Sequence, residues 1–284
     1  MNRVFVQHAV RNIFHSVVLM ACMLLVCAMV GWVFWGVDGL VYFSTLTVVG
    51  LFISLRISPR LIFKMYGAVP IREEEAPHLL LMMNRLAQRA GLPKRPQLYY
   101  IPSQAPNAFA VGSRRTGAIA ITEGLLNGFT PRELQGVLAH EMGHLRRNDG
   151  FVMSLAVSAG QLVSIMSWIG KVVVLIHFPF YVFGGYQLPW LPIIILVFAP
   201  PITALLQLAL SRTREFEADF EAARSTGDPI GLASALQKLE GLSGNWFERL
   251  FLQRRKARES FLFWTHPPTE ERIRRLLELE RSLD

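Results

Sequence analysis

The sequence predicts a mostly α-helical membrane protein with a small β-sheet, and two observations lead to this fold class. The chain of 284 residues is 52% hydrophobic and has a positive mean hydropathy, which is more apolar than an ordinary soluble domain. The apolar residues are concentrated in four uncharged stretches, at residues 17–37, 40–55, 150–170 and 188–210. Each stretch is interpreted as a transmembrane helix, so that the four form two hairpins.

The first hairpin is predicted from residues 17–37 and 40–55, which are separated by Asp38-Gly39. As a helix at roughly 1.5 Å per residue, the first stretch covers about 31 Å, which is enough to cross the hydrocarbon core. It is too long for a cleavable signal peptide and has no small-residue cleavage site after it, so we interpret it as an anchor.

The second hairpin contains two ambiguous features. Its last stretch, residues 188–210, is expected to kink or break at Pro200-Pro201. Residues 172–186 are apolar and contain Pro179, and they either extend the third span or lie in the membrane interface.

The net charge of +8 is best explained by membrane topology. Basic residues flank the predicted spans on one side: Arg3, Arg11, Arg56, Arg60, Lys64, Arg146, Arg147, Arg212 and Arg214. The turns on the other side carry only Asp38 and Lys171. By the positive-inside rule, both termini and both polar segments face the cytoplasm. Nucleic-acid binding is disfavoured because no nucleic-acid motif accompanies the basic residues.

The predicted spans divide the chain into four parts. These are a transmembrane hairpin at 1–57, a polar block at 58–149, a second hairpin at 150–210 and a second polar block at 211–284. The two cysteines, Cys22 and Cys27, both lie within the first apolar run, where their helical spacing prevents a bridge. The chain therefore has no disulfide framework, which is consistent with a reducing compartment for the polar blocks.

The polar blocks contain helical and strand signals. In the first block a helix is expected over residues 76–91, and strands over 97–101, 107–111 and 117–122. Thr130-Pro131-Arg132-Glu133 is a capping box with proline at the first helical position, and it begins a helix that continues to about Asn148. In the second block helices are expected at 211–225, 229–242, 246–260 and 268–282.

The most informative pattern, His140-Glu141-Met142-Gly143-His144, lies on the capped helix. His140 and His144 are four residues apart and so share one helical face. Two imidazoles placed in this way can bind one zinc ion, with Glu141 beside them as general base toward a water molecule. The pattern also arises by chance in unrelated chains, where it is a pair of ordinary surface histidines.

An acidic cluster in the second polar block supplies a third metal ligand and a hydrogen-bond acceptor for a ligating histidine. Glu215 is the expected third protein ligand, and Asp219, one turn later, is expected to accept a hydrogen bond from a ligating imidazole, that of His140. Glu217 faces away from Glu215 on a helix and fits the ligand role less well. The alternative is an acidic pair on a solvated face, bridged by arginines.

With these strings in place, the whole chain resembles the HtpX-like membrane zinc proteases, which are relatives of the type I CAAX prenyl proteases. The matching strings are His140-Glu141-Met142-Gly143-His144, Ser211-Arg212-Thr213-Arg214-Glu215-Phe216-Glu217-Ala218-Asp219, His266-Pro267-Pro268-Thr269-Glu270-Glu271-Arg272 and Pro106-Asn107-Ala108-Phe109-Ala110. Their order and the four-span layout match over nearly the full length. The resemblance implies a gluzincin-type fold with one Zn2+ per chain.

The resemblance also implies a biological setting. It implies a bacterial inner-membrane protein that cleaves misfolded or damaged membrane proteins as part of quality control under stress. Membrane-protein substrates and the lipid bilayer are then the expected partners, with other quality-control proteases of the membrane as candidates. The oligomeric state is left open.

Further roles follow from the resemblance alone. His266 and Arg272 would lie near the active site, where His266 could donate a hydrogen bond to the developing oxyanion. From its residues alone, this segment is better explained as a helix start capped by Thr269.

The resemblance assigns substrate binding to an edge strand at residues 107–111, which would hold an extended substrate by main-chain pairing. The substrate-binding residues would be Asn107, Ala108, Phe109 and Ala110. On this expectation a proline at Phe109 removes a ladder donor from the edge strand and weakens substrate cleavage. The alternative is an ordinary strand of the sheet.

Three rival functions can be weighed against this prediction. An intramembrane protease would carry the histidine motif within an apolar span, whereas here charged residues flank it. A non-proteolytic membrane protein with a structural zinc site would not need Glu141. A processing protease for prenylated C-termini has more spans around a large chamber, for which a 284-residue chain is too short.

Overall fold

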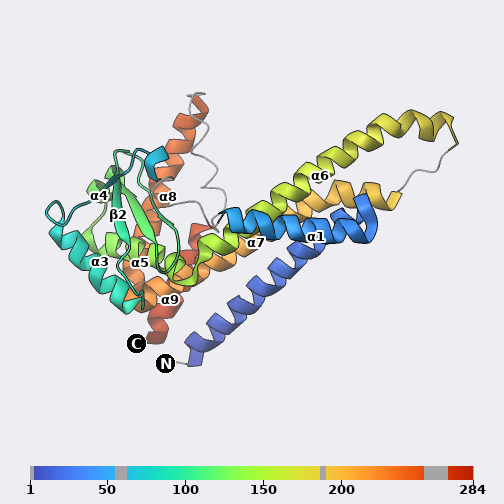
Figure 1. Ribbon diagram of the computed structural model, residues 1–284. Helices are drawn as coiled ribbons and strands as arrows, with labels where there is room; N and C mark the ends of the chain where they lie inside the picture. The colour runs from blue at the N-terminus through green and yellow to red at the C-terminus, as the bar shows by residue number, and fades with distance from the viewer. Residues whose placement is uncertain (1–2, 55–62, 186–189, 253–267, 284) are drawn as a thin grey trace. The chain divides into compact units, whose positions relative to one another are not determined.

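The computed structural model describes residues 3–54, 63–185, 190–252 and 268–283, which belong to two compact units (Figure 1). The first unit comprises residues 1–56 and 151–213, and the second comprises residues 57–150 and 214–284. The predicted catalytic residue His266 and the predicted helical residues 253–260 lie outside the described residues.

The first unit is built from three long helices, α1 (Arg3–Ser54) and parts of α6 (Asp149–Phe183) and α7 (Trp190–Thr226). Helical geometry in α1 is interrupted at Trp35 and Gly36, and Gly36 has a φ of +58°. Glycine adopts this conformation readily because it has no Cβ. The break therefore comes two residues before Asp38, where the sequence predicted the turn.

Within the described residues, three helical segments are long and apolar enough to cross a membrane: Phe14–Val33, Asp149–Phe183 and Trp190–Thr226. The predicted second span, residues 40–55, is helical as far as Ser54 but is not one of these three. Three of the four predicted spans are thus represented among these helices, and the second span stays a prediction.

The two later helices are longer than expected. Helix α6 continues through Pro179 to Phe183, so residues 172–183 extend the third predicted span as helix. Helix α7 passes through Pro200 and Pro201 without a break, so that of the two expected outcomes only a kink stays a prediction, and it continues into the acidic cluster. At roughly 1.5 Å per residue both helices exceed the roughly 30 Å of a hydrocarbon core.

Small side chains let the helices of the first unit approach closely. Its core combines residues of the three helices: Met23, Cys27, Val30, Ala156, Ala159, Val163, Leu196, Ala199 and Leu210. Gln207 Nε2 donates a hydrogen bond of 2.8 Å to the carbonyl of Ala156. A Cβ added to Gly160 would lie 1.9 Å from that nitrogen, so this glycine leaves room for the polar side chain.

A mixed four-stranded sheet organises the second unit. Its order is β1 (Val69–Pro70), β2 (Gln97–Ile101), β4 (Ala118–Thr122) and β3 (Ala108–Val111). Strands β2 and β4 are parallel, and the other two pairs are antiparallel. The three predicted strands are confirmed to within one residue. Strand β1 was missed because two residues, one of them proline, give no periodic signal.

The described part of the second unit also contains the helices α3 (Pro77–Arg89), α4 (Glu123–Gly128), α5 (Pro131–Arg147), α8 (Pro229–Leu252) and α9 (Thr269–Leu283). Helix α5 begins with the predicted capping box. Thr130 Oγ1 accepts from the Glu133 backbone N–H, and Glu133 Oε2 accepts from the Thr130 N–H. The helix ends at Arg147, and its C-cap, Asn148, has left-handed backbone angles. Helix α4 was not predicted.

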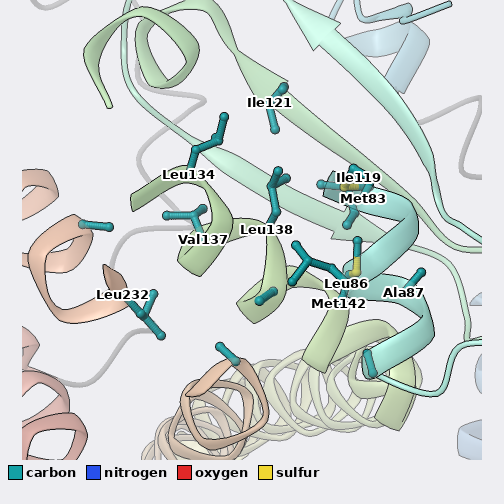
Figure 2. Packing of buried hydrophobic residues seen from close by; sticks show 14 of the residues in the cluster. Met83, Leu86, Ala87, Ile119, Ile121, Leu134, Val137, Leu138, Met142 and Leu232 are labelled. Carbon is teal, nitrogen blue, oxygen red and sulfur yellow. The ribbon is translucent and has the colours of Figure 1, made fainter. Parts of the chain in front are cut away.

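Helix α5 is the central element of this unit. Figure 2 shows its apolar side chains meeting the sheet, helix α3 and helix α8. The contacts join Leu134, Val137, Leu138 and Met142 to Met83, Leu86, Ile119, Ile121 and Leu232. Packing on several sides fixes the position of α5, and with it the histidine motif that the helix carries.

Candidate metal centre

Three side chains converge between α5 and α7. The Nε2 atoms of His140 and His144 lie 3.2 Å apart. The Glu215 carboxylate approaches them, with Oε2 3.4 Å from His140 Nε2 and Oε1 3.6 Å from His144 Nε2. One ligand atom from each residue lies within 4.8 Å of the others, as a shared metal ion requires.

These separations match the geometry of zinc. Zinc binds nitrogen and oxygen ligands at about 2.0–2.1 Å in a tetrahedron, which places neighbouring ligand atoms about 3.3 Å apart. The separation of 3.2 Å between the two imidazole nitrogens lies close to this value, and the two Glu215 oxygens lie 3.4 and 3.6 Å from one nitrogen each. Two imidazoles and one carboxylate also leave a fourth position open, which is the arrangement of catalytic zinc sites.

A close helix crossing brings the two halves of this centre together. A Cβ added to Gly143 would lie 3.2 Å from the Ala218 Cα and 3.3 Å from its carbonyl oxygen. Ala218 is itself fully buried. The small residues at this crossing allow the backbones of α5 and α7 to approach, so that Glu215 reaches both histidines.

A buried carboxylate contacts the outer nitrogen of the first histidine. Asp219 Oδ1 lies 2.9 Å from His140 Nδ1. Arg272 on α9 donates to the same carboxylate, with Nη2 2.6 Å from Oδ1 and Nε 2.8 Å from Oδ2. Its Nη1 lies 3.3 Å from Glu215 Oε2. Helix α9 therefore contributes one arginine that contacts both acidic residues of the cluster.

The electrostatics of this cluster favour a cation at the histidines. Burial lowers the pKa of His140, but its contacts with Asp219 and Glu215 raise that pKa to about 10. Burial raises the pKa of Asp219, whereas Arg272 and His140 lower it to about 2. A site that stabilises the imidazolium in this way also attracts a metal ion, and protons compete with that ion.

The remaining predicted residues are distributed as follows. Glu141 is buried beside His140, and its charge is among those that raise the pKa of Arg272, against the lowering effect of burial. Glu217 pairs with Arg147 and is not part of the three-residue cluster.

A carboxylate that the sequence analysis did not single out touches the second histidine. Asp149, the first residue of α6, places Oδ2 2.9 Å from His144 Nδ1. Its only signal in the sequence was an acidic side chain at the boundary between a polar block and an uncharged span.

The predicted substrate strand lies at one edge of the sheet, and α5 packs next to it. The Asn107 carbonyl accepts a 3.0 Å hydrogen bond from the Thr122 N–H, and the Asn107 N–H donates to Thr122 Oγ1. Since antiparallel pairs alternate, Phe109 also directs its main-chain groups toward β4. Ala108 and Ala110 direct theirs to the free edge.

This register specifies the ladder to which the Phe109 donor belongs. The main-chain donor of Phe109 belongs to the β3–β4 ladder and is not on the free edge, so a proline at Phe109 would break the sheet itself. The outward-facing groups come from Ala108 and Ala110, and within the described residues no further strand pairs with them.

Comparisons with known proteins agree with this geometry. The model of peptidase family M48 matches residues 73–280. A protease HtpX homolog of Acaryochloris marina is 41% identical over 80% of this chain and 80% of its own length. One of Trichormus variabilis is 36% identical over 96% of this chain and 98% of its own length. The crystal structure of S. mikatae Ste24p has a similar fold, with a TM-score of 0.52 and 20% identity, over 95% of this chain and 66% of that one.

Proposed function

The chain belongs to peptidase family M48 and is a membrane metalloprotease, and from that premise we propose that it is a zinc-dependent endoprotease of gluzincin type. Its proposed substrates are misfolded or damaged membrane proteins, cleaved in their cytoplasmic segments. The observation that carries the proposal is the convergence of His140, His144 and Glu215, with one ligand atom from each within 4.8 Å of the others.

The donor set defines what each residue would do. His140, His144 and Glu215 would hold one zinc ion, which when bound polarises the scissile carbonyl and acidifies the attacking water. Glu141 would accept the proton of that water at its carboxylate and then donate it to the leaving amine. Asp219 would hold the His140 ring in the orientation that presents Nε2 to the metal.

Arg272 would act chiefly through Asp219 and Glu215, because its Nη2 and Nη1 lie 2.6 and 3.3 Å from these carboxylates, and its Nη2 also lies 3.4 Å from His140 Nδ1. It would balance the charge of both carboxylates and hold them in place. The proposal retains His266 as the donor to the developing oxyanion, on the basis of the family motif that it shares with Arg272.

The edge strand supports an extended substrate. The outward main-chain groups of Ala108 and Ala110 can pair with a peptide added beside β3, as in other complexes formed by strand addition. Their own side chains pack against the core next to α5. Because main-chain groups are the same in every peptide, this mode predicts broad sequence tolerance and a requirement for unfolded segments.

The proposed location is the bacterial inner membrane, with both termini and the second unit in the cytoplasm. Support comes from the flanking basic residues and from the positive-inside rule. The chain also passes directly from the ligand helix into a candidate span, since only Asn148 separates α5 from α6. Substrates with cytoplasmic segments close to the membrane suit that arrangement.

The direct test is cleavage of a detergent-solubilised membrane protein by the purified full chain. Wild type should cleave it, a zinc chelator should stop cleavage, and added zinc should restore it. Glu141→Gln should lose 10²-fold or more of the rate, the order expected for a missing general base, while keeping its zinc. Glu278→Gln, an exposed glutamate on α9, is the matched control and should cleave as wild type does.

The same variants separate the proposal from a structural zinc site. A structural site would leave every measured property of Glu141→Gln unchanged. Cleavage by Glu141→Gln within a few-fold of wild type would therefore overturn the catalytic assignment. Loss of zinc in that variant would show that Glu141 holds the site together, which the proposal does not expect.

A further inference from the structure

His144 has its own buried carboxylate partner, in addition to the one that His140 has. Asp149 Oδ2 lies 2.9 Å from His144 Nδ1, and the Asp149 side chain is 4% exposed. The two histidines thus share one pattern of carboxylate contacts. Each turns Nε2 toward Glu215 and Nδ1 toward a separate aspartate, Asp219 for the first and Asp149 for the second.

The position of Asp149 is set by the turn between two helices. Helix α5 ends at Arg147, and the left-handed residue Asn148, with a φ of +53°, separates it from α6, which begins at Asp149. Asn148 Oδ1 accepts a 2.9 Å hydrogen bond from the Arg114 backbone N–H, which ties the turn to the β3–β4 connection. The Asp149 carboxylate therefore follows directly after a residue that is tied to another segment of the unit.

Two arginines neutralise the buried carboxylate. Arg214 Nη1 donates a 3.0 Å hydrogen bond to Asp149 Oδ1, and Arg147 Nε lies 3.7 Å from the same oxygen. Arg214 immediately precedes Glu215 on α7. One turn of α7 therefore supplies both a ligand of the centre and the anchor for the carboxylate that contacts another ligand.

The contact between Asp149 and His144 determines the tautomer and the orientation of the imidazole ring. A neutral imidazole has one N–H, and a carboxylate at Nδ1 keeps the proton on that nitrogen and leaves the Nε2 lone pair free for a metal. The contact also fixes the rotation of the ring. Arg214 donates to Asp149 Oδ1 and leaves Oδ2 available to accept from the His144 ring.

We infer that Asp149 is a positioning residue that holds His144 ready for the metal, with Arg214 as its anchor. The inference rests on the proposed function, because it concerns the zinc site of that function. Asp149 is part of α6, so this contact also links the ligand helix to the first residue of a candidate membrane span.

The test is zinc affinity of the full chain in detergent, measured by competition with a chromophoric chelator. Asp149→Ala should weaken zinc binding by 10- to 100-fold, the usual effect of removing a hydrogen-bond partner of a metal ligand. Asp149→Asn should have a smaller effect because the amide oxygen can still accept. Arg214→Gln should act in the same direction through Asp149, and it serves as the second variant if Asp149→Ala does not fold.

The matched control is Asp228→Asn, which removes another arginine-paired aspartate of the same unit. Asp228 accepts two hydrogen bonds from Arg132 and none from the metal-site residues. Its zinc affinity should stay within twofold of wild type. The visible absorption of the cobalt-loaded protein should change in the Asp149 variants and not in Asp228→Asn, because only the former alter the ligand geometry.

Zinc affinities within twofold of wild type in the Asp149 and Arg214 variants would overturn the inference. An equal loss in Asp228→Asn would overturn it as well, since the effect would then be general destabilisation. Zinc binding that depends on Asp149 in a protein that cleaves nothing would overturn the proposed function alone. Cleavage with zinc binding that is independent of Asp149 would overturn this inference alone.

Discussion

Arg272 Nη2 and Nε donate hydrogen bonds of 2.6 and 2.8 Å to the two carboxylate oxygens of Asp219. Both side chains are buried, so the carboxylate depends on the arginine for its charge balance. Because Asp219 also contacts His140, this ion pair couples the placement of α9 to the orientation of the His140 ring.

Arg272→Ala should destabilise the second unit by about 3–5 kcal/mol, since it leaves two buried carboxylates without their arginine. Chemical denaturation of the detergent-solubilised protein measures this change. The control is Arg274→Ala on the same helix, where the side chain is 65% exposed and the expected loss is below about 0.5 kcal/mol. Equal losses in the two variants would show that the buried pair has no special role.

Gly143→Ala should weaken zinc binding even though it alters no ligand. The added Cβ meets the Ala218 backbone at 3.2–3.3 Å, so α5 and α7 must separate by a few tenths of an ångström, which moves Glu215 from the histidines. A stability loss of about 1–3 kcal/mol is typical for such overpacking. Gly128→Ala is the control, because a Cβ there has open space. Unchanged zinc affinity in Gly143→Ala would mean that the crossing tolerates the methyl group.

Ala110→Pro should reduce proteolysis while leaving the fold intact. The substitution removes an outward-facing N–H of β3 without breaking the ladder to β4, and proline is tolerated at such edge positions. Phe109→Pro should instead lower the thermal stability, because the N–H of Phe109 faces β4. Rates and melting temperatures of both variants check the register. A stable Phe109→Pro enzyme with reduced cleavage would reverse the assignment of the two faces.

The stability contributed by Glu133 should depend on pH. Burial raises its pKa, but the Thr130 N–H, the Ser234 hydroxyl and Lys238 lower it from 4.5 to about 2. A lowered folded-state pKa gives stability that is present above pH 4.5 and lost as the pH falls toward 2. The advantage of wild type over Glu133→Gln should therefore shrink in that window, by roughly 3 kcal/mol at most. An advantage that does not change between pH 6 and pH 3 would contradict this assignment.

The proposed topology predicts which sites a membrane-impermeant thiol reagent reaches. After replacement of Cys22 and Cys27, a cysteine at Asp38 should be labelled from the periplasmic side. A reporter fused after Asp284 should indicate the cytoplasm, because basic residues are retained on that side. Periplasmic signal from the Asp284 fusion would overturn the orientation.

Several parts of this protein follow from the sequence by itself. Local chemistry determines the start of helix α5, since the side chains of Thr130 and Glu133 each accept a hydrogen bond from the other residue's backbone N–H. Helical spacing alone places His140 and His144 on one face, and uncharged length alone predicts the spans. Such features depend on neighbours along the chain, so residue patterns are enough to reveal them.

Other parts were decided only by the tertiary structure. The meeting of Glu215 with the two histidines depends on the close crossing at Gly143 and Ala218. The outward groups of β3 depend on the hydrogen bond between Asn107 and Thr122, because a run of four apolar residues does not show which main-chain groups face the partner strand.

Asp149 illustrates the same limit most clearly. In the sequence it is one acidic residue before an apolar stretch, and topology alone accounts for it. In the folded chain Asp149 follows the left-handed residue Asn148, and its carboxylate contacts His144. Arg214, from a distant segment, pairs with the same carboxylate. Contacts between segments that are far apart in the chain leave no periodic pattern, so only the packing of α5, α6 and α7 could show this one.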